Sequence, residues 1–332
     1  MSVTDGTTVS HDLSLPGFTL GHASDREGMT GVTVILCPDG AIAAADVRGT
    51  ATGTRQFDSL RIGHSLNSKA HALVLAGGSA YGLSAADPVM ERLAAAGHGL
   101  RTGFRPVPIV PTAILFDFGF GDGSAVPSRE LVESALDDAT AGTVEVGSVG
   151  AGTGATVGKL NGRECGMKGG LGFVSLTVPE GPTVAAVVAV NAYGNVRDPE
   201  TGRPIAGTRV APESRELLDG ERLLERLDPG SRNTWDGNTT LAVVLTDAQL
   251  SKPEARKVCE MAFGGLYRCL SPALTSYDGD LVVTLARGER RAHLHQVGAL
   301  AQRAVGAAIV RAVSEADGFG LLPAVRDLTD GS

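Results

Sequence analysis

Short runs of apolar residues recur along the chain and predict a β-rich core. Several of these runs are continuous instead of alternating with polar residues, which is typical of strands covered on both faces. The sequence therefore predicts sheets buried between other layers. Strands are expected at Gly31–Leu36, Ala41–Val47, Ala72–Ala76, Ala113–Phe118, Gly172–Val178, Val184–Val190, Thr240–Leu245 and Leu281–Leu285.

Four longer segments have the periodicity of helices. The last of them carries a stripe of mostly small apolar residues, which would allow close packing on a neighbour. Ser128 and Ser251 stand where N-caps of two of these helices are expected. Pro88 lies inside another and should distort it. The helices are expected at Ser84–Ala95, Arg129–Ala139, Pro253–Leu270 and Leu294–Val313.

Composition narrows the class of protein. The chain has 332 residues, of which 42% are hydrophobic, enough for a large core in one domain or two. Its 45 glycines gather in short motifs, which favours many tight turns within an ordered fold. The net charge is −8 without any basic run, so a nucleic-acid-binding surface is not expected. No apolar stretch reaches the roughly 18 residues of a membrane span, and we expect a cytoplasmic protein.

Cysteine and histidine spacing does not indicate a metal site. The four cysteines (Cys37, Cys165, Cys259 and Cys269) are far apart and form no Cys-x-x-Cys pair. We expect them to be buried as small apolar side chains. The histidines show no ligand spacing with nearby carboxylates. The sequence therefore implies no metal and no cofactor.

One segment, residues 197–235, differs from the rest in being charged and rich in proline. A long polar segment inside a compact domain needs an explanation. It could be a linker that bends near a cleavage site, or an insertion without a role. The sequence leaves both readings open.

The junction Asn238-Thr239-Thr240 follows this segment and precedes an apolar run. A β-branched Thr at the start of a buried strand has its hydroxyl held rigidly. If the preceding peptide bond is cut, the new α-amine of Thr239 can act as the base for that hydroxyl. Gly-Asn before a strand is also a common turn. The local sequence alone does not decide between a nucleophile and a turn.

A series of motifs in the rest of the chain bears on this choice. These motifs are Gly21-His22-Ala23-Ser24-Asp25, Asp46-Val47-Arg48-Gly49, Gly53-Thr54-Arg55, Gly77-Gly78-Ser79-Ala80-Tyr81-Gly82, Gly150 to Lys159, Val188-Ala189-Val190-Asn191-Ala192, Gly237-Asn238-Thr239-Thr240 and Asp278-Gly279-Asp280. With them, from about residue 16 to about residue 320, the chain closely resembles the self-processing family of L-aminopeptidase/D-amino-acid esterase-amidases. That family includes β-peptidyl aminopeptidases and 6-aminohexanoate (nylon) oligomer hydrolases, and it is distantly similar to ornithine acetyltransferases.

The resemblance implies an α+β fold, a four-layer αββα sandwich. The chain would form a single catalytic domain that cuts itself into an α chain, 1–238, and a β chain, 239–332. The cleaved heterodimers would assemble into a homo-oligomer, a tetramer of cleaved heterodimers. The implied activity is a Thr amidohydrolase that cuts short peptide-like or ω-amino-acid amides. Two other hypotheses are acyl transfer of the ornithine acetyltransferase type, and a binding scaffold whose junction stays intact.

The resemblance also assigns roles to single residues. Thr239 would be the nucleophile, Lys159 would lower the pKa of its ammonium or orient its hydroxyl, and Asn191 would donate to an oxyanion. Asp278 and Asp280 would hold the new ammonium. Without the resemblance, each of these has a plainer reading: an exposed loop lysine, an Asn that ends a strand, and an Asp-Gly turn.

The chain departs from the aminopeptidase branch at the segment 114–117. That branch carries an acid and a Tyr there, the acid gripping the free ammonium of the substrate, whereas this chain has Ile114 and Phe116 in those places. Asp117 is the acid that remains. We expect Asp117, Phe116 and Tyr81 to line the substrate pocket, with the glycine-rich junction 77–82 beside it. Strict recognition of a substrate N-terminus is therefore in doubt.

Overall fold

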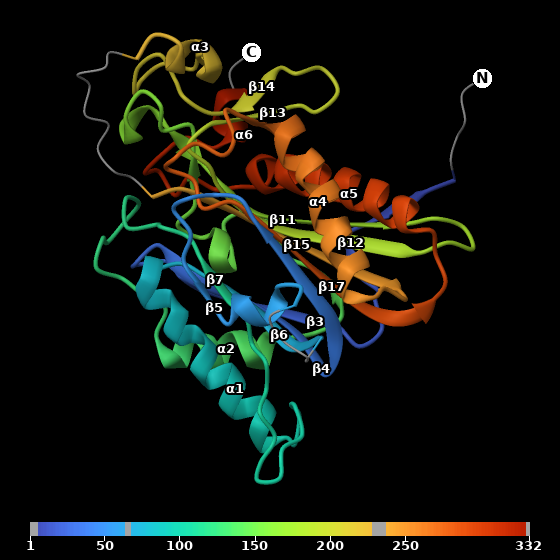
Figure 1. Ribbon diagram of the computed structural model, residues 1–332. Helices are drawn as coiled ribbons and strands as arrows, with labels where there is room; N and C mark the ends of the chain where they lie inside the picture. Colours follow the sequence, from blue (N-terminus) through green and yellow to red (C-terminus); the bar gives the residue numbers. More distant parts are fainter. Residues whose placement is uncertain (1–5, 64–67, 228–236, 330–332) are drawn as a thin grey trace.

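The computed structural model of the chain describes residues 6–63, 68–227 and 237–329 (Figure 1). Its main feature is a mixed 10-stranded sheet. Nine of its strands follow the order β1-β11-β12-β15-β17-β4-β6-β7-β5, and the tenth, β3, pairs with β4. The strands of this sheet are β1 (Thr8–Ser10), β3 (Thr19–Asp25), β4 (Thr30–Val47), β5 (Thr54–Arg55), β6 (Lys69–Ala76), β7 (Thr112–Ile114), β11 (Gly170–Thr177), β12 (Thr183–Asn191), β15 (Thr239–Ala248) and β17 (Leu281–Arg290).

The rest of the described part of the chain holds six α-helices, four short 3₁₀ helices, two strand pairs (β2 with β8, β9 with β10) and a three-stranded sheet of β14, β13 and β16. The helices are α1 (Ala86–Ala95), α2 (Arg129–Asp138), α3 (Gly220–Leu224), α4 (Lys252–Cys269), α5 (Leu294–Ser314) and α6 (Val325–Thr329). The short strands are β2 (Asp12–Leu13), β8 (Gly142–Thr143), β9 (Thr156–Val157), β10 (Met167–Lys168), β13 (Asn195–Arg197), β14 (Pro204–Ala206) and β16 (Leu270–Ser271).

Strand β4 joins the two halves of the sheet. The sequence predicted two strands here, but they form one strand of 18 residues with a shift of register between Leu36 and Ala41. The N-terminal half pairs with β3 and β6, and the C-terminal half pairs with β17. One continuous sheet can therefore supply two stacked layers.

Three apolar clusters show how the layers stack. Because side chains alternate along a strand, Val188, Ala242 and Val244 face the cluster that contains α4 and α5. Their neighbours Val187 and Val243 face a central cluster shared with β6 and β7. A third cluster lies between β4, β6 and the helices α1 and α2. The predicted four-layer αββα sandwich is confirmed, with α4 and α5 on one outer side and α1 and α2 on the other (Figure 1).

The helix predictions are close to the observed boundaries. Ser128 caps α2, and Ser251 caps α4 in a capping box with Glu254. Helix α1 begins at Ala86, so Pro88 lies in its first turn, where a missing N–H costs no helical hydrogen bond. By length and composition α5 could cross a membrane, but most of its apolar residues pack in the core with α4 and the sheet.

Two other segments differ from the expected pattern. Strand β7 ends at Ile114, where the prediction continued to Phe118. Within the segment 197–235, residues 197–227 carry β14, α3 and a buried Arg209, while residues 228–235 lie outside the described part. The Arg209 guanidinium donates to the carbonyls of Glu164, Gly166 and Pro212. This part of the segment is therefore folded against the domain.

Candidate active site

The predicted cleavage junction lies at the start of a central strand. Thr239 is the first residue of β15 and stands opposite Asn191, the last residue of β12. On the other side, Asn238 forms a bridge with Asp278, just before β17. The two neighbouring strands therefore bring Asn191 and the Asp278–Asp280 loop to the same end of β15. All of these residues are buried.

The carbonyl oxygen of Asn238 is held by two donors. It accepts a hydrogen bond from the Gly279 N–H at 2.8 Å and from the Thr239 hydroxyl, Oγ1, at 2.5 Å. The Asn238 N–H donates to the carbonyl of Tyr277 at 3.0 Å. The peptide bond that the sequence marks for cleavage is thus fixed against the loop that carries the two acids. A backbone N–H aimed at the carbonyl oxygen is the arrangement that stabilises an oxyanion.

Position 279 has too little room for any side chain, so it requires glycine. A Cβ at this position would lie 2.7 Å from the Thr239 Oγ1 atom and 2.5 Å from the Ala51 carbonyl oxygen. Sequence reasoning interpreted Gly279 only as part of an Asp-Gly turn. A backbone N–H donor is not tied to any residue type. Only the position of Gly279 between two predicted acids could have indicated that its N–H has a role.

Lys159, Asn191 and Thr156 form a second group. The Lys159 ammonium donates to the Thr156 carbonyl at 2.8 Å, to the Thr156 hydroxyl at 2.9 Å and to Asn191 Oδ1 at 3.0 Å. Asn191 Oδ1 also accepts from the Thr156 N–H at 3.0 Å, and its Nδ2 donates to the Phe116 carbonyl at 2.8 Å. Lys159 is therefore a buried member of a network rather than an exposed loop lysine. Thr156 was not predicted from the sequence.

This geometry bears on the predicted role of Asn191. Its amide group is oriented by three donors to Oδ1 and one acceptor for Nδ2, so the assignment of its oxygen and nitrogen follows from the network. In the uncut chain its NH₂ group donates to the Phe116 carbonyl. The oxyanion role of Asn191 stays a prediction for the substrate complex.

Asp278 and Asp280 are both buried and both satisfied by donors. Asp278 accepts from the Tyr193 N–H at 3.1 Å and from the Thr275 N–H and hydroxyl, at 3.0 and 2.6 Å. Asp280 accepts from the Thr240 N–H at 2.7 Å. Burial raises the pKa of Asp278, and burial together with the charge of Asp278 raises the pKa of Asp280. A cation introduced beside this pair would stabilise both carboxylates.

A cavity of about 270 Å³ lies beside the junction. Lys159, Thr156 and Gly237 are in its lining, so it reaches the group that contacts Asn191 and the chain just before Asn238. Its other walls are mostly small or apolar. The remaining lining residues are Phe116, Asp117, Gly119, Phe120, Gly121, Gly154, Arg163, Glu164, Leu321 and Leu322.

Asp117 is in this lining, but its oxygens already accept hydrogen bonds. Oδ1 accepts from the Gly78 N–H and Oδ2 from the Thr30 hydroxyl, each at 2.7 Å. Burial raises its pKa to about 6 against these hydrogen bonds and the charge of Lys168. The fully buried Lys168 donates to the carbonyls of Gly152, Ala155 and Gly169. It therefore ties down the glycine-rich loop that leads to Thr156, a role that the sequence did not reveal.

The other two predicted pocket residues, Phe116 and Tyr81, differ in their position relative to the cavity. Phe116 lines the cavity and packs edge-on against Phe118. Tyr81 is 71% exposed, contacts Phe118 and is not among the lining residues in the described part of the chain. Ile114 packs in the cluster beneath α1 and α2, away from the cavity lining. Ile114 is therefore not part of this cavity wall.

The cysteines and the acidic residues do not suggest a different chemistry. All four cysteines are buried and unpaired, as expected. Within residues 6–63, 68–227 and 237–329, no group of His, Cys, Asp and Glu side chains has the arrangement of a metal site. The arrangement offers a hydroxyl nucleophile, a backbone oxyanion donor, a buried cation and two buried acids around one peptide bond.

Sequence comparison with known proteins identifies the family. The pattern of Peptidase family S58 matches residues 13–322. An uncharacterized aminopeptidase of Mycobacterium leprae is 43% identical over 270 residues, which cover 78% of this chain and 71% of that protein. A 6-aminohexanoate-oligomer endohydrolase of Paenarthrobacter ureafaciens is 32% identical over 283 residues, covering 82% of this chain and 74% of that protein.

Solved structures show the same fold at low sequence identity. The Burkholderia sp. beta-aminopeptidase has a TM-score of 0.69 at 20% identity and covers 96% of this chain and 92% of its own. The L-aminopeptidase D-Ala-esterase/amidase of Ochrobactrum anthropi, described as a variant of the Ntn hydrolase fold, has a TM-score of 0.69 at 18% identity, with 92% and 86% covered. With this fold, and with the family pattern over most of its length, the chain belongs to Peptidase family S58 and is a hydrolase that acts on amide bonds.

Proposed function

We propose that the chain cuts its own bond between Asn238 and Thr239, and that Thr239 then serves as the N-terminal nucleophile. The observation that carries this proposal is the Asn238 carbonyl, held between the Thr239 hydroxyl and the Gly279 N–H. The hydroxyl oxygen attacks the carbonyl carbon, the C–N bond breaks, and the hydroxyl proton ends on the released amine. Water then hydrolyses the ester to give a carboxylate on Asn238 and a free Thr239.

The new terminus supplies the base for the second reaction. An α-amine has an ordinary pKa of about 7.7–8.0, so it can accept the hydroxyl proton near neutral pH. The two buried acids whose pKa values are raised, Asp278 and Asp280, would hold its ammonium form, and the Lys159 charge would favour the neutral amine. The hydroxyl attacks the substrate amide, an acyl-enzyme forms on Thr239, and water releases the acid.

The substrates we propose are short peptide-like or ω-amino-acid amides. The cavity is small, and its walls combine apolar side chains with charged ones. The apolar ones are Phe116, Phe120, Leu321 and Leu322, and the charged ones are Asp117, Lys159, Arg163 and Glu164. Relatives named as aminopeptidase and as 6-aminohexanoate-oligomer endohydrolase support this class. The ornithine acetyltransferase alternative is not favoured, because the relatives that match are hydrolases.

The decisive experiment is the size of the purified protein. Wild type is expected as two fragments, residues 1–238 and 239–332, and N-terminal sequencing of the smaller fragment should give Thr-Thr-Leu-Ala. Thr239→Ala should remain one chain and should not hydrolyse amides, whereas Thr239→Ser keeps a hydroxyl and should still be cut. An uncut wild type with full amidase activity would disprove the mechanism, because the amine base would not exist.

Three further expectations are part of this proposal. The cleaved heterodimers assemble into a homo-oligomer, which sedimentation of the processed protein tests. The enzyme works in the cytoplasm, which fractionation tests. The segment 197–235 serves as the linker before the cut. Because residues 197–227 are folded against the domain, the shortening is made within 228–235, and it should slow self-cleavage without changing the catalytic constants of the cleaved enzyme.

A further inference from the structure

The segment that follows β4, residues 48–51, holds the loop of the two acids by its backbone. The N–H groups of Arg48 and Gly49 donate to the Asp280 carbonyl at 3.1 and 2.9 Å. Those of Thr50 and Ala51 donate to the Asp278 carbonyl at 2.9 and 3.1 Å. Four consecutive N–H groups therefore fix the two residues that flank Gly279.

The contact between this segment and the loop is very close. A Cβ on Gly49 would lie 2.2 Å from the Asp280 nitrogen and 2.4 Å from the Gly279 carbonyl carbon. Ala51 of the same segment is also close, because a Cβ on Gly279 would lie between the Ala51 carbonyl and the Thr239 hydroxyl. A shift of residues 48–51 would therefore be transmitted to Gly279, whose N–H contacts the Asn238 carbonyl.

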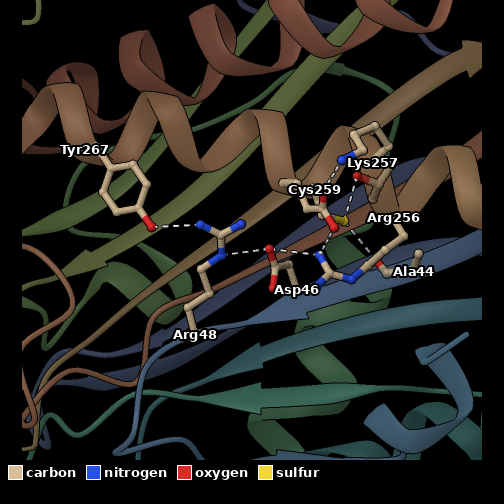
Figure 2. A network of polar contacts seen from close by, with 9 residues as sticks. Ala44, Asp46, Arg48, Arg256, Lys257, Cys259 and Tyr267 are labelled. Carbon is tan, nitrogen blue, oxygen red and sulfur yellow. Dashed lines mark hydrogen bonds and ion pairs between the residues drawn. The ribbon is translucent and has the colours of Figure 1, made fainter.

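Side chains around Asp46 anchor the start of this segment (Figure 2). The Arg48 Nε donates to Asp46 Oδ2 at 2.8 Å, and its NH1 donates to the Tyr267 hydroxyl at 2.9 Å. The guanidinium also lies over the ring of Phe263, 4.4 Å from its centroid. Arg48 is thereby fixed to β4 by Asp46 and to α4 by two aromatic side chains.

Asp46 is shared by a second arginine. Arg256 of α4 lies 2.8 Å from the same Oδ2 atom, and only 4% of the Asp46 side chain is exposed. Arg256 also faces Glu260 at 3.5 Å, and Glu260 pairs with Lys257. The two halves of the network differ. Arg48 belongs to the segment that holds the acid loop, whereas Arg256, among the described residues, forms its ion pairs with Asp46 and with Glu260 of its own helix.

We propose that Asp46 and Arg48 are positioning residues for cleavage of the Asn238–Thr239 bond and for the amidase reaction that follows. They act through residues 48–51, which set the place of the Gly279 N–H against the carbonyl under attack. This inference rests on the proposed self-cleavage. None of these side chains touches the reacting atoms.

The test compares Arg48→Met with the matched variant Arg256→Met. Each removes one guanidinium from Asp46, but only Arg48→Met loosens the segment that holds the acid loop. Self-cleavage is followed on gels after a pulse of cell-free translation. Melting temperatures are measured with Thr239→Ala added to each variant, so that every chain compared is uncut.

We expect Arg48→Met to cleave roughly 10- to 100-fold more slowly than wild type, since displacements of about 1 Å at a reacting group have effects of this size. Arg256→Met should cleave within about threefold of wild type at a similar fall in melting temperature. Material that does become cleaved in Arg48→Met should show a lower kcat with little change in KM, because an oxyanion donor acts mainly in the transition state.

The outcomes separate this inference from the proposed function. Cleavage rates of the two variants that simply follow their melting temperatures would overturn the positioning role, because the network would then be structural only. If Arg48→Met fails to fold, the same comparison is made with Tyr267→Phe, which removes one partner of the guanidinium. An uncut wild type would instead show that the proposed self-cleavage itself is wrong.

Discussion

Replacing Gly279 by Ala tests the oxyanion arrangement directly. The added methyl group would lie 2.5 Å from the Ala51 carbonyl oxygen and 2.7 Å from the Thr239 hydroxyl oxygen. Both distances are shorter than a Cβ tolerates, and neither neighbour is the end of a flexible side chain. The loop, the hydroxyl or both must move, so the 2.8 Å hydrogen bond from the Gly279 N–H to the Asn238 carbonyl is lost or misplaced.

The size of the effect follows from what this hydrogen bond does. Removal of one oxyanion donor costs about 10²- to 10³-fold in rate, about 2.7–4 kcal/mol. Overpacking at a buried site costs about 1–3 kcal/mol of stability, which a domain of this size tolerates. We therefore expect a folded chain whose self-cleavage is at least about 100-fold slower than that of wild type.

The assay is a time course of the uncut chain on a denaturing gel, with mass spectrometry of the products. Gly103→Ala is the matched control, because a Cβ at Gly103 meets no atom within 4 Å. The control should cleave like wild type. If Gly279→Ala also cleaved at the wild-type rate while remaining folded, the Gly279 N–H would have no part in the reaction.

The remaining predictions concern the other groups of the site. Asn191→Ala should lose kcat more than it raises KM, measured by steady-state kinetics, and unchanged kinetics would leave Asn191 a structural residue. Lys159→Met removes a cation that donates to three acceptors and should slow both self-cleavage and turnover by about 10-fold or more, measured by gel and by amide hydrolysis. Asp117 has a pKa raised to about 6, so it can hold a substrate ammonium only above that pH: the ratio of kcat/KM for a free aminoacyl anilide to that for its acetylated form should rise as pH increases through about 6, because ionisation of the Thr239 amine affects both substrates alike. Equal profiles for the two substrates would show that Asp117 does not bind the ammonium. The same shift makes the stability contributed by the protonated Asp117 fall as pH rises from 3.8 to about 6, so Asp117→Asn should flatten the dependence of melting temperature on pH between these values.

The layers of the fold could be predicted from the sequence because buried strands and helices have a recognisable pattern of apolar residues. Continuous apolar runs such as 241–245 lie in strands covered on both faces, and serine caps mark the starts of α2 and α4. The end of β7 was not accessible. After Ile114 the chain turns into the site, where the Phe116 carbonyl accepts from Asn191 and Asp117 bonds to Gly78, and such long-range contacts leave no periodicity.

Residues of the candidate site could be predicted from the sequence only where a side chain supplies the chemistry. Thr239, Asn191, Lys159 and the two acids could be named, and the structure brings them to one end of β15. The Gly279 N–H could not, because every residue but proline carries one. The burial of Lys168 and Asp46 was missed for another reason: a charged residue gives no sign in the sequence that it will be buried by contacts with carbonyls or guanidiniums far along the chain.

The order of strands around the junction has a consequence for the lifetime of the processed protein. In the central sheet β12 and β4 come before the junction, whereas β15 and β17, which lie between them, come after it. Cleavage would leave the small fragment as the middle of a sheet whose flanks belong to the large one, so the fragments could not separate without breaking the core. After thermal unfolding, the two separated fragments would have to associate again by diffusion. Refolding would then depend on protein concentration. The lifetime of the active enzyme would be set by its rate of unfolding and not by a reversible equilibrium between the folded and unfolded states.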